Sequence, residues 1–315
     1  MRHRRNLAST DYKVNFMTQP LDTPPVDHTL CLGPLPDVAP ANFAVPRGAC
    51  DTHAHVIGDG VRYPYVDNRS YTPPPAPEDK YLAMLAACGM TRGVLVQVSV
   101  HGTDNRYMLD VLGRHPDTLR GVAVVNADVS DQALQAMHAA GVRGVRFNVL
   151  FGGGVGLDAL DRLAPRIARL GWHAQFLMDV RHLPDLVPRL AKLPVPCVFD
   201  HMGHMPVSEG MQHPGFQALL HGVKEYGWWA KLSGAYRISD QFDHYDDVTP
   251  WAQALIQAAP DRMVWGSDWP HVAISRMPDT GVLRNLLPKW APSEAQRQRI
   301  LVDNPQALYD FPALD

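Results

Sequence analysis

Short apolar runs rich in β-branched residues alternate with longer segments of helical period from about residue 49 onward, and this alternation is the strongest constraint on the fold. The runs predict eight strands, at Ala49–His55, Gly93–Ser99, Gly121–Val125, Gly144–Asn148, Ala174–Met178, Cys197–His201, Trp229–Ser233 and Met263–Ser267. The segments between them predict helices, at Glu78–Cys88, Tyr107–Arg114, Gln132–Ala140, Leu157–Leu170, Leu183–Lys192, His213–Tyr226 and Trp251–Ala258. In the third helix, Leu134, Met137 and Ala140 recur at the spacing of one helix face. Such alternation is typical of a parallel α/β fold.

The number and size of these units favour a closed barrel. Eight strand–helix units in about 250 residues match the size of a (β/α)₈ barrel. The tripeptide Arg-Gly-Val starts at Arg92, Arg120 and Arg143, which is a weak internal repeat with the length of one unit. Runs such as Val94–Val96 are apolar throughout, as expected of strands that are buried on both faces. The sequence therefore predicts an α/β protein with a (β/α)₈ barrel, and an open, doubly wound sheet is the alternative.

The first 45 residues differ from the rest of the chain. Prolines at positions 20, 24, 25, 34, 36 and 40 interrupt this segment, and no hydrophobic period is sustained along it. Such a composition is typical of an extended, irregular segment. We therefore predict two parts, a proline-rich N-terminal extension over residues 1–45 and a barrel over residues 46–315.

Composition and charge exclude several classes of function. The formal net charge is −3, so the chain as a whole lacks the strong basic charge of a nucleic-acid-binding protein, and a local basic patch stays open. No apolar run is long enough to span a bilayer, and the basic residues at the start are not followed by the apolar core of a secretory signal. Cys31, Cys50, Cys88 and Cys197 lack metal-binding spacing and predict free thiols. We expect a cytoplasmic protein without nucleic-acid or membrane partners, either a monomer or a homo-oligomer.

Ionisable side chains gather at one end of the predicted strands. Barrels of this kind carry their active sites at the carboxyl ends of the strands. The polar residues at these ends are His53, His55, Ser99, His101, Asn126, Arg146, Asn148, Asp179, His201, His204, Ser233, Arg237, Asp268 and His271. Because side chains alternate along a strand, His53 and His55 leave the same side of the first one. His173 falls at a strand start instead, where a role in stability is expected.

Three motifs resemble the amidohydrolase superfamily, in the branch of 2-pyrone-4,6-dicarboxylate lactonase (amidohydrolase family 2). They are Asp-Thr-His-Ala-His at 51–55, Asp-His-Met-Gly at 200–203 and Trp-Gly-Ser-Asp-Trp-Pro-His at 265–271. The similarity extends from about Val45 to Phe311. The resemblance implies a distorted barrel and a hydrolase, namely a lactonase that opens a carboxylated lactone in aromatic or sugar-acid catabolism.

The residues themselves fit ester hydrolysis. This reaction needs a base that takes a proton from water, a group that stabilises the oxyanion and an acid for the leaving oxygen. Asp268, at the end of the last strand, is the only carboxylate that the sequence places opposite the histidines, and we predict that it is the general base. His53, His55 and His201 are predicted to polarise the lactone carbonyl, either as hydrogen-bond donors or through a metal ion.

The metal content is constrained by residues that the chain lacks. Two-metal members of the superfamily use a lysine on the fourth strand and a histidine that ends the fifth. Here no lysine occurs between Lys80 and Lys192, and the fifth strand ends in Met178-Asp179. The resemblance implies a metal-independent lactonase, so we predict no obligate cofactor. A single Zn²⁺ or Mn²⁺ stays open, because three protein ligands and water make a workable zinc site. Its ligands would be His53, His55, His201 and Asp268.

Substrate contacts are expected from arginines at the strand ends. Arg146 and Arg237 can hold carboxylates through their guanidinium forks, and a structural salt bridge is the alternative for each. The resemblance adds polar contacts from Tyr71, Ser99, His101 and His271. Two segments depart from the pattern of the lactonase, because Val149–Gly154 lacks an arginine and Gln175–Met178 lacks a tyrosine. The partner is thus a small anionic lactone, with a pyrone dicarboxylate, a muconolactone, a sulfonate or a sugar-acid lactone all open.

Two other activities of the superfamily are alternatives. Isomerisation of a sugar-acid lactone by acyl migration would use the same carbonyl activation without net addition of water. A metal-dependent decarboxylase would share the His-x-His motif and the terminal aspartate, but it needs a histidine at the end of the fifth strand, where Met178 stands here.

Overall fold

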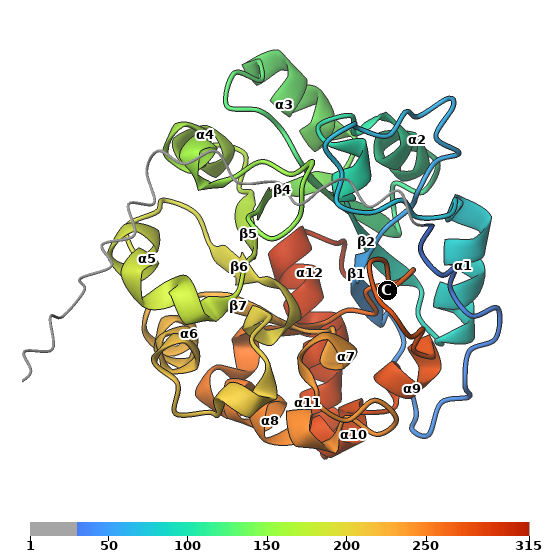
Figure 1. The fold of residues 1–315 in the computed structure, drawn as a ribbon, viewed down its shortest axis with the longest axis vertical. Coiled ribbons are helices and arrows are strands. Elements are labelled where there is room, and N and C mark those ends of the chain that lie inside the picture. The colour runs from blue at the N-terminus through green and yellow to red at the C-terminus, as the bar shows by residue number, and fades with distance from the viewer. Residues whose placement is uncertain (1–29, 315) are drawn as a thin grey trace, which may run out of the picture.

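The computed structural model describes residues 30–314, and eight parallel strands form a barrel within them (Figure 1). Each strand pairs with the next along the chain. The strands are β1 (Cys50–Ala54), β2 (Arg92–Val96), β3 (Leu119–Ala123), β4 (Val142–Asn148), β5 (His173–Leu177), β6 (Cys197–Phe199), β7 (Trp229–Leu232) and β8 (Met263–Trp265). The eight predicted strands and the (β/α)₈ class are confirmed, although the strand ends shift by a few residues.

Helices surround the strands (Figure 1). They are α1 (Glu78–Ala87), α2 (Arg106–Arg114), α3 (Asp131–Ala139), α4 (Leu160–Ala168), α5 (Leu183–Leu190), α6 (Pro214–Glu225), α7 (Ala235–Ile238), α8 (Thr249–Ala258), α9 (Thr280–Arg284), α10 (Leu287–Trp290), α11 (Glu294–Gln298) and α12 (Asn304–Tyr309). The seven predicted helices are confirmed. Hydrophobic periodicity does not predict α7 or α9 to α12, because helices of four to six residues are too short to show it. Caps mark two of them, since Asp279 accepts from Gly281 N and Ser293 begins a capping box.

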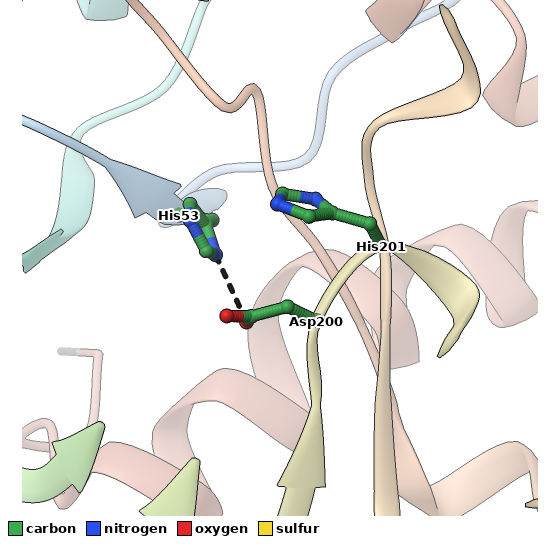
Figure 2. Close-up of side chains that lie close together, drawn as sticks. All are labelled: His53, Asp200 and His201. Carbon is green, nitrogen blue, oxygen red and sulfur yellow. Dashed lines mark ion pairs between the residues drawn. The ribbon is translucent and has the colours of Figure 1, made fainter. Parts of the chain in front are cut away.

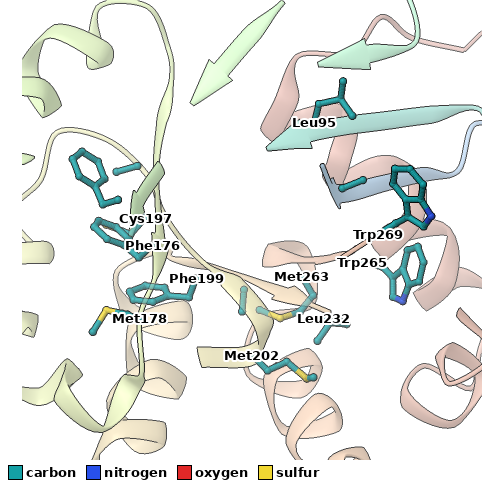
Figure 3. Close-up of a cluster of buried hydrophobic side chains, with 14 of the residues drawn as sticks. Leu95, Phe176, Met178, Cys197, Phe199, Met202, Leu232, Met263, Trp265 and Trp269 are labelled. Carbon is teal, nitrogen blue, oxygen red and sulfur yellow. The ribbon is translucent and has the colours of Figure 1, made fainter. Parts of the chain in front are cut away.

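Alternate side chains of the strands pack outward against the helices. Phe147 on β4, Phe176 on β5 and Phe199 on β6 form a row in which successive ring centroids lie 5.7 and 5.5 Å apart. Figure 3 shows Phe176 and Phe199 in this buried cluster. Each such pair contributes about 0.5–1.5 kcal/mol beyond the area that it buries. The intervening positions of the same strands, such as Arg146 and Gln175, point into the barrel instead.

The amino end of the barrel is closed by α12. The fully buried Tyr309 packs with Cys50, Val94 and Val122, which lie on β1, β2 and β3. Its ring centroid lies 5.3 Å from that of His173, at the start of β5. In Figure 1, α12 is seen near the centre of the ring of strands. Only the opposite end of the barrel, at the carboxyl ends of the strands, is therefore available for a functional site.

The three arginines of the Arg-Gly-Val repeat hold the C-terminal segment against this closed end. Arg120 Nη2 donates to Asp310 O over 3.1 Å, and Arg143 pairs with the Asp310 carboxylate over 3.2 Å. The guanidinium groups of Arg92 and Arg120 lie over the ring of Phe311, 5.2 and 4.8 Å from its centroid. The repeat therefore contributes to stability at the face opposite the polar strand ends.

The barrel is distorted at the seam between β8 and β1. Within the described residues, the ladder runs from β1 to β8 and does not join these two strands to each other. Instead, Ser267 Oγ donates to Asp51 Oδ2 over 2.6 Å, and Ser267 N donates to Asp51 Oδ1 over 2.8 Å. Asp268 N donates to His53 O over 2.7 Å. The seam thus places Asp268 directly beside His53.

The part of the N-terminal extension that the structure describes, residues 30–45, runs along the surface without a helix or a ladder strand. Cys31 N donates to Thr72 O over 2.8 Å, and Arg284 Nη2 donates to Ala39 O over 2.8 Å. Residues 1–29 of the predicted extension lie outside the described residues. None of the described helices combines the length and the apolar character that a membrane span requires.

His173 gives a testable dependence of stability on pH. It is 1% exposed, and burial lowers its pKa to about 3. In the unfolded chain this histidine is protonated below about pH 6.5, whereas in the folded chain it stays neutral down to about pH 3. The free energy of unfolding therefore falls as the pH drops from 6.5 toward 3. At pH 5 we expect this histidine to cost about 2 kcal/mol. His173→Phe keeps a ring beside Tyr309 and should reduce the decline in urea unfolding between pH 6.5 and 5 by that amount.

The matched control is His221→Phe, at an exposed position on α6. It should leave the decline of stability with pH as in the wild type. An identical decline in the His173→Phe protein would contradict the prediction.

Candidate active site

Four side chains from distant parts of the chain meet where the strands finish. They are His53 on β1, His55 just after it, His201 after β6 and Asp268 after β8. The Asp268 carboxylate oxygens lie 3.7 Å from His53 Nε2, 3.6 Å from His55 Nε2 and 3.7 Å from His201 Nε2. All four residues are at most 3% exposed. The structure therefore brings together the four residues that the sequence singled out, while their chemical roles stay predictions.

The two oxygens of Asp268 have different surroundings. Oδ2 accepts hydrogen bonds from Tyr236 Oη and Arg237 Nε, each over 2.6 Å. Oδ1 faces His53 and His55. Burial acts to raise the pKa of Asp268, but the Arg237 charge and the neighbouring histidines outweigh it and hold the pKa well below its ordinary value. The group is thus a carboxylate with one oxygen anchored and one open to the histidines.

The ring of His55 is fixed by its backbone partner. Its Nδ1 lies 2.7 Å from Val96 O, and a carbonyl oxygen can only accept, so Nδ1 carries the proton. In the neutral ring, Nε2 then presents a lone pair toward Asp268 Oδ1. Two acceptors therefore face each other across 3.6 Å. That arrangement suits a proton donor such as water, or a cation, between them.

His201 is presented by a left-handed turn. His201, Met202 and His204 have φ of 52°, 53° and 53°, and Gly203 between them has φ of 92°. Left-handed backbone costs about 1–2 kcal/mol for each residue other than glycine, and such strain concentrates at functional sites. The turn sets His201 Nδ1 at 2.9 Å from Ser233 Oγ, which leaves Nε2 for the site.

A second carboxylate lies beside His53, which corrects the expectation that Asp268 alone faces the histidines. Asp200 Oδ1 is 3.2 Å from His53 Nδ1 (Figure 2). Asp200 Oδ2 accepts from Arg146 Nε and Gln175 Nε2, each over 3.2 Å. Burial acts to raise the pKa of Asp200, but His53, Lys231 and Arg146 hold it well below its ordinary value. Asp200 is therefore an ionised group on the inner side of the histidine cluster.

Sequence reasoning missed two further neighbours of the cluster, Lys231 and Tyr236. Lys231 Nζ lies inside the barrel, 3.2 Å from His53 Nδ1 and 3.6 Å from Asp200 Oδ1. Tyr236 follows β7 and donates to Asp268. The available signal for Lys231 was a lysine within an apolar strand, because lysine is rarely fully buried unless it is paired. Tyr236 carried no signal beyond its place next to Arg237.

Both predicted substrate arginines pair with site carboxylates. Arg146 Nε contacts Asp200, and Arg237 Nε contacts Asp268. Each arginine therefore forms a structural salt bridge through its Nε, as the alternative prediction stated. Arg146 nevertheless has no partner for its Nη atoms among the described residues. Burial raises the pKa of Tyr71 to about 12, opposed by its hydrogen bond with Ser99 and by the charges of Arg146 and Arg237. A role in substrate binding stays a prediction.

The remaining predicted contacts have different surroundings. Tyr71 Oη and Ser99 Oγ lie 3.0 Å apart and are buried. Both ring nitrogens of His101 are engaged with backbone, since Nε2 accepts from Gly58 N over 3.1 Å and Nδ1 lies 3.3 Å from Pro64 O. His271 Nε2 lies 2.8 Å from Thr280 Oγ1, and its Nδ1 lies 3.3 Å from Tyr236 Oη. The contacts of His101 and His271 hold loops together, and substrate contact by all four residues stays a prediction.

The segment that follows β4 packs closely on this end of the barrel. Gly152 N donates to Ser70 Oγ over 2.7 Å, and the Phe151 ring lies 5.8 Å from that of Tyr71. At Gly153, where φ is +85°, a Cβ atom would come within 2.3 Å of Ser99 O. Only glycine permits that close approach of the two backbones.

The histidine and aspartate cluster could hold a metal ion. The ligand atoms of His53, His55 and Asp268 lie within 4.8 Å of one another, and so do those of His53, Asp200 and His201. His53 Nε2 is buried without a hydrogen-bond partner in the described part of the chain. Imidazole nitrogens with a carboxylate are ligands that zinc prefers. These groups could therefore bind a metal ion.

Comparison with known proteins gives the family. The amidohydrolase family profile matches residues 50–311. A 4-sulfomuconolactone hydrolase of Hydrogenophaga intermedia is 40% identical over 285 residues, 89% of this chain and 94% of the relative. A 2-pyrone-4,6-dicarboxylate hydrolase of Comamonas testosteroni is 39% identical over 279 residues, 85% of this chain and 92% of the relative. A crystal structure of an Agrobacterium tumefaciens protein is 32% identical, with a TM-score of 0.80, and the match covers 88% of this chain and all of that one.

These matches agree with the barrel and with the resemblance found in the three sequence motifs. The chain belongs to the amidohydrolase family.

Proposed function

We propose that this protein is a lactonase, a hydrolase that opens the ring of a small anionic lactone by attack of water on the ring carbonyl. The observation that carries the proposal is the buried Asp268 carboxylate, whose Oδ1 is open to His53 and His55 at 3.7 and 3.6 Å. The two relatives that are hydrolases of a sulfomuconolactone and of a pyrone dicarboxylate support the reaction class.

Asp268 takes the role of general base in this proposal. Its Oδ2 is anchored by Tyr236 and Arg237, so Oδ1 is the atom that accepts a proton from water. The low pKa keeps it ionised but lowers its proton affinity. The lone pair on His55 Nε2, 3.6 Å away, is a second acceptor that holds the same water. The proton then passes to the leaving oxygen of the opened ring.

Activation of the carbonyl falls to His53 and His201. His53 Nε2 lies 3.7 Å from Asp268 Oδ1, and His201 Nε2 lies 3.7 Å from Asp268 Oδ2. Donors placed where negative charge develops stabilise a tetrahedral intermediate more than they do the substrate. One such donor contributes about a 10²–10³-fold increase in rate. We therefore assign these two histidines to the oxyanion.

The free donors of Arg146 favour an anionic substrate. Arg146 pairs with Asp200 through Nε, so its Nη groups remain able to bind an anion. We propose that the free Nη atoms of Arg146 hold a carboxylate or sulfonate of the lactone.

The four central side chains are at most 3% exposed, and we propose that a covering segment moves when the substrate enters. Our candidate is Val149–Gly154, whose glycines pack against Ser70 and Ser99. Lids of this kind sequester a reaction from water and gate the release of product.

A divalent cation could be held at the same site. Zn²⁺ or Mn²⁺ would be held by His53, His55 and Asp268. His201, whose Nε2 lies 3.7 Å from the Asp268 carboxylate, would be a further ligand. Such an ion would polarise the carbonyl and lower the pKa of a bound water. The protein's own donors and acceptors supply the roles described above, so we propose that a metal is not obligate.

A panel of lactones in weakly buffered pH indicator tests the reaction class. We expect acid release with muconolactone, sulfomuconolactone or pyrone carboxylate substrates. A decarboxylase would consume protons and release CO₂, and a lactone isomerase would leave the pH unchanged. Absence of acid release across the panel would contradict the proposal.

Removal of metal tests the cofactor. After treatment with a chelator and metal analysis of the purified protein, we expect hydrolysis to continue at the untreated rate. Loss of activity that added Zn²⁺ or Mn²⁺ restores would show that the metal is required.

A further inference from the structure

Lys231 is a lysine enclosed within the barrel beside the site. It lies on β7, and its side chain is 0% exposed. Its Nζ lies 2.8 Å from Gln175 Oε1, 3.0 Å from Thr52 O and 3.2 Å from His53 Nδ1. A lysine buried so completely needs partners for all three of its N–H groups, and these three atoms supply them.

The N–H groups of Lys231 determine which ring nitrogen of His53 carries the proton. Two of the partners are oxygens of an amide and a carbonyl, which accept, so Lys231 donates to both. Its third N–H points to His53 Nδ1. An ammonium group has no lone pair, so Nδ1 must present one and the proton of the neutral imidazole lies on Nε2.

Asp200 is the competitor for the same nitrogen. Its Oδ1 also lies 3.2 Å from His53 Nδ1, and a hydrogen bond to it would need the proton on Nδ1. That oxygen makes no aligned hydrogen bond within the described residues, whereas the contact from Lys231 is aligned. We therefore read Asp200 as the counter-charge of Lys231, 3.6 Å away, and not as the acceptor of the His53 proton.

We propose that Lys231 is a positioning residue that holds His53 in the tautomer with the proton on Nε2. His53 then donates into the site, while His55, fixed in the opposite tautomer by Val96 O, accepts. The pair is polarised, with a donor for the carbonyl oxygen and an acceptor for the attacking water. The catalytic meaning of this pair rests on the proposed lactonase function, and the tautomer itself does not.

The same device acts against a metal at this position. A cation binds an imidazole through a lone pair, so binding at His53 Nε2 requires the proton to move to Nδ1. Lys231 would then have to turn its third N–H toward Asp200. Asp200 would also accept a hydrogen bond from the proton that now lies on His53 Nδ1. Lys231 therefore weakens binding of a divalent cation and favours direct hydrogen bonding by the histidine.

The tautomer can be measured in the metal-free full-length protein. Long-range ¹H–¹⁵N spectra of histidine-labelled protein distinguish protonated from unprotonated ring nitrogens. Signals of His53 are assigned by their absence in His53→Gln. We expect a protonated Nε2 and an unprotonated Nδ1, and a protonated Nδ1 in the wild type would overturn the proposal.

Lys231→Met supplies the second test, because methionine retains an unbranched apolar side chain and removes the donor. We expect the His53 proton to move to Nδ1, affinity for Zn²⁺ in a competition with a chelating dye to rise about 10–100-fold, and kcat to fall about 100-fold with KM little changed. A folded variant that keeps both the tautomer and the Zn²⁺ affinity of the wild type would overturn the proposal.

Lys224→Met, at a lysine 68% exposed on α6, is the matched control and should change none of these quantities. If Lys231→Met does not fold, the wild-type spectrum alone decides. Failure of the wild type to hydrolyse any lactone would contradict the proposed function and leave the tautomer and Zn²⁺ results standing as the test of this inference.

Discussion

Asp268→Asn is expected to lower kcat for lactone hydrolysis by about 10²–10⁴-fold. Asparagine retains the size of the side chain, and its amide oxygen can still accept from Tyr236 and Arg237. The amide cannot take a proton from water, and Arg237 loses its negative partner. Steady-state kinetics with the lactones that release acid measures the effect, and thermal unfolding shows whether the variant remains folded.

Asp261→Asn provides the matched control for this substitution. Asp261 precedes β8, its side chain is 71% exposed, and it pairs with Arg299 over 3.2 Å. Exposed pairs of this kind contribute little to stability, so we expect both activity and unfolding temperature to match the wild type. Full lactonase activity in a folded Asp268→Asn protein would remove Asp268 from the mechanism.

The strands were predictable from the sequence because each is buried on both faces and bounded by a helix of sufficient length. Their ends were less predictable. The strand expected to continue to His201 stops at Phe199, because His201 and Met202 adopt left-handed backbone. The pattern of apolar residues carries no information on such a turn. It depends on contacts far along the chain, such as that of His201 with Ser233.

The central site was predictable for a topological reason. In a barrel of parallel strands, residues at the carboxyl ends converge whatever their distance in sequence, so His53, His201 and Asp268 could be grouped without coordinates. The layer beneath them could not be grouped in that way. Lys231 and Asp200 lie inside the barrel, beneath the histidines. Their pairing depends on which inward-pointing side chains of neighbouring strands lie at the same level along the barrel axis.

The site carboxylates Asp200 and Asp268 explain why each of the two arginines could be predicted to have either a structural or a binding role. Arg146 contacts Asp200 through Nε, and this contact is structural. Its Nη atoms remain available to a ligand. Arg237 is tied more completely, since Nε contacts Asp268 and Nη2 donates to Val272 O over 3.1 Å. Structural and binding roles are therefore compatible in Arg146, and a substitution that separates them is needed.

Arg146→Lys separates the two roles. The lysine Nζ can replace Nε beside Asp200, so the buried ion pair persists, but the two Nη donors disappear. We expect KM for an anionic lactone to rise about 10–100-fold, which corresponds to the loss of about 1.5–3 kcal/mol from charged hydrogen bonds, with kcat little changed. Kinetics with lactones that carry and lack the anionic group measures the difference, and the uncharged substrate should be unaffected.

Arg146→Met removes the ion pair as well and leaves the fully buried Asp200 with a lost partner. Unfolding in urea should then be easier by about 3–5 kcal/mol, whereas Arg146→Lys should unfold close to the wild type. Arg189→Lys, at an arginine 35% exposed on α5 that pairs with Asp161, controls for the exchange itself. If Arg146→Lys were to keep the wild-type KM while Arg146→Met lost stability, Arg146 would serve only to hold Asp200, and the anionic group of the substrate would have to be bound elsewhere in the site.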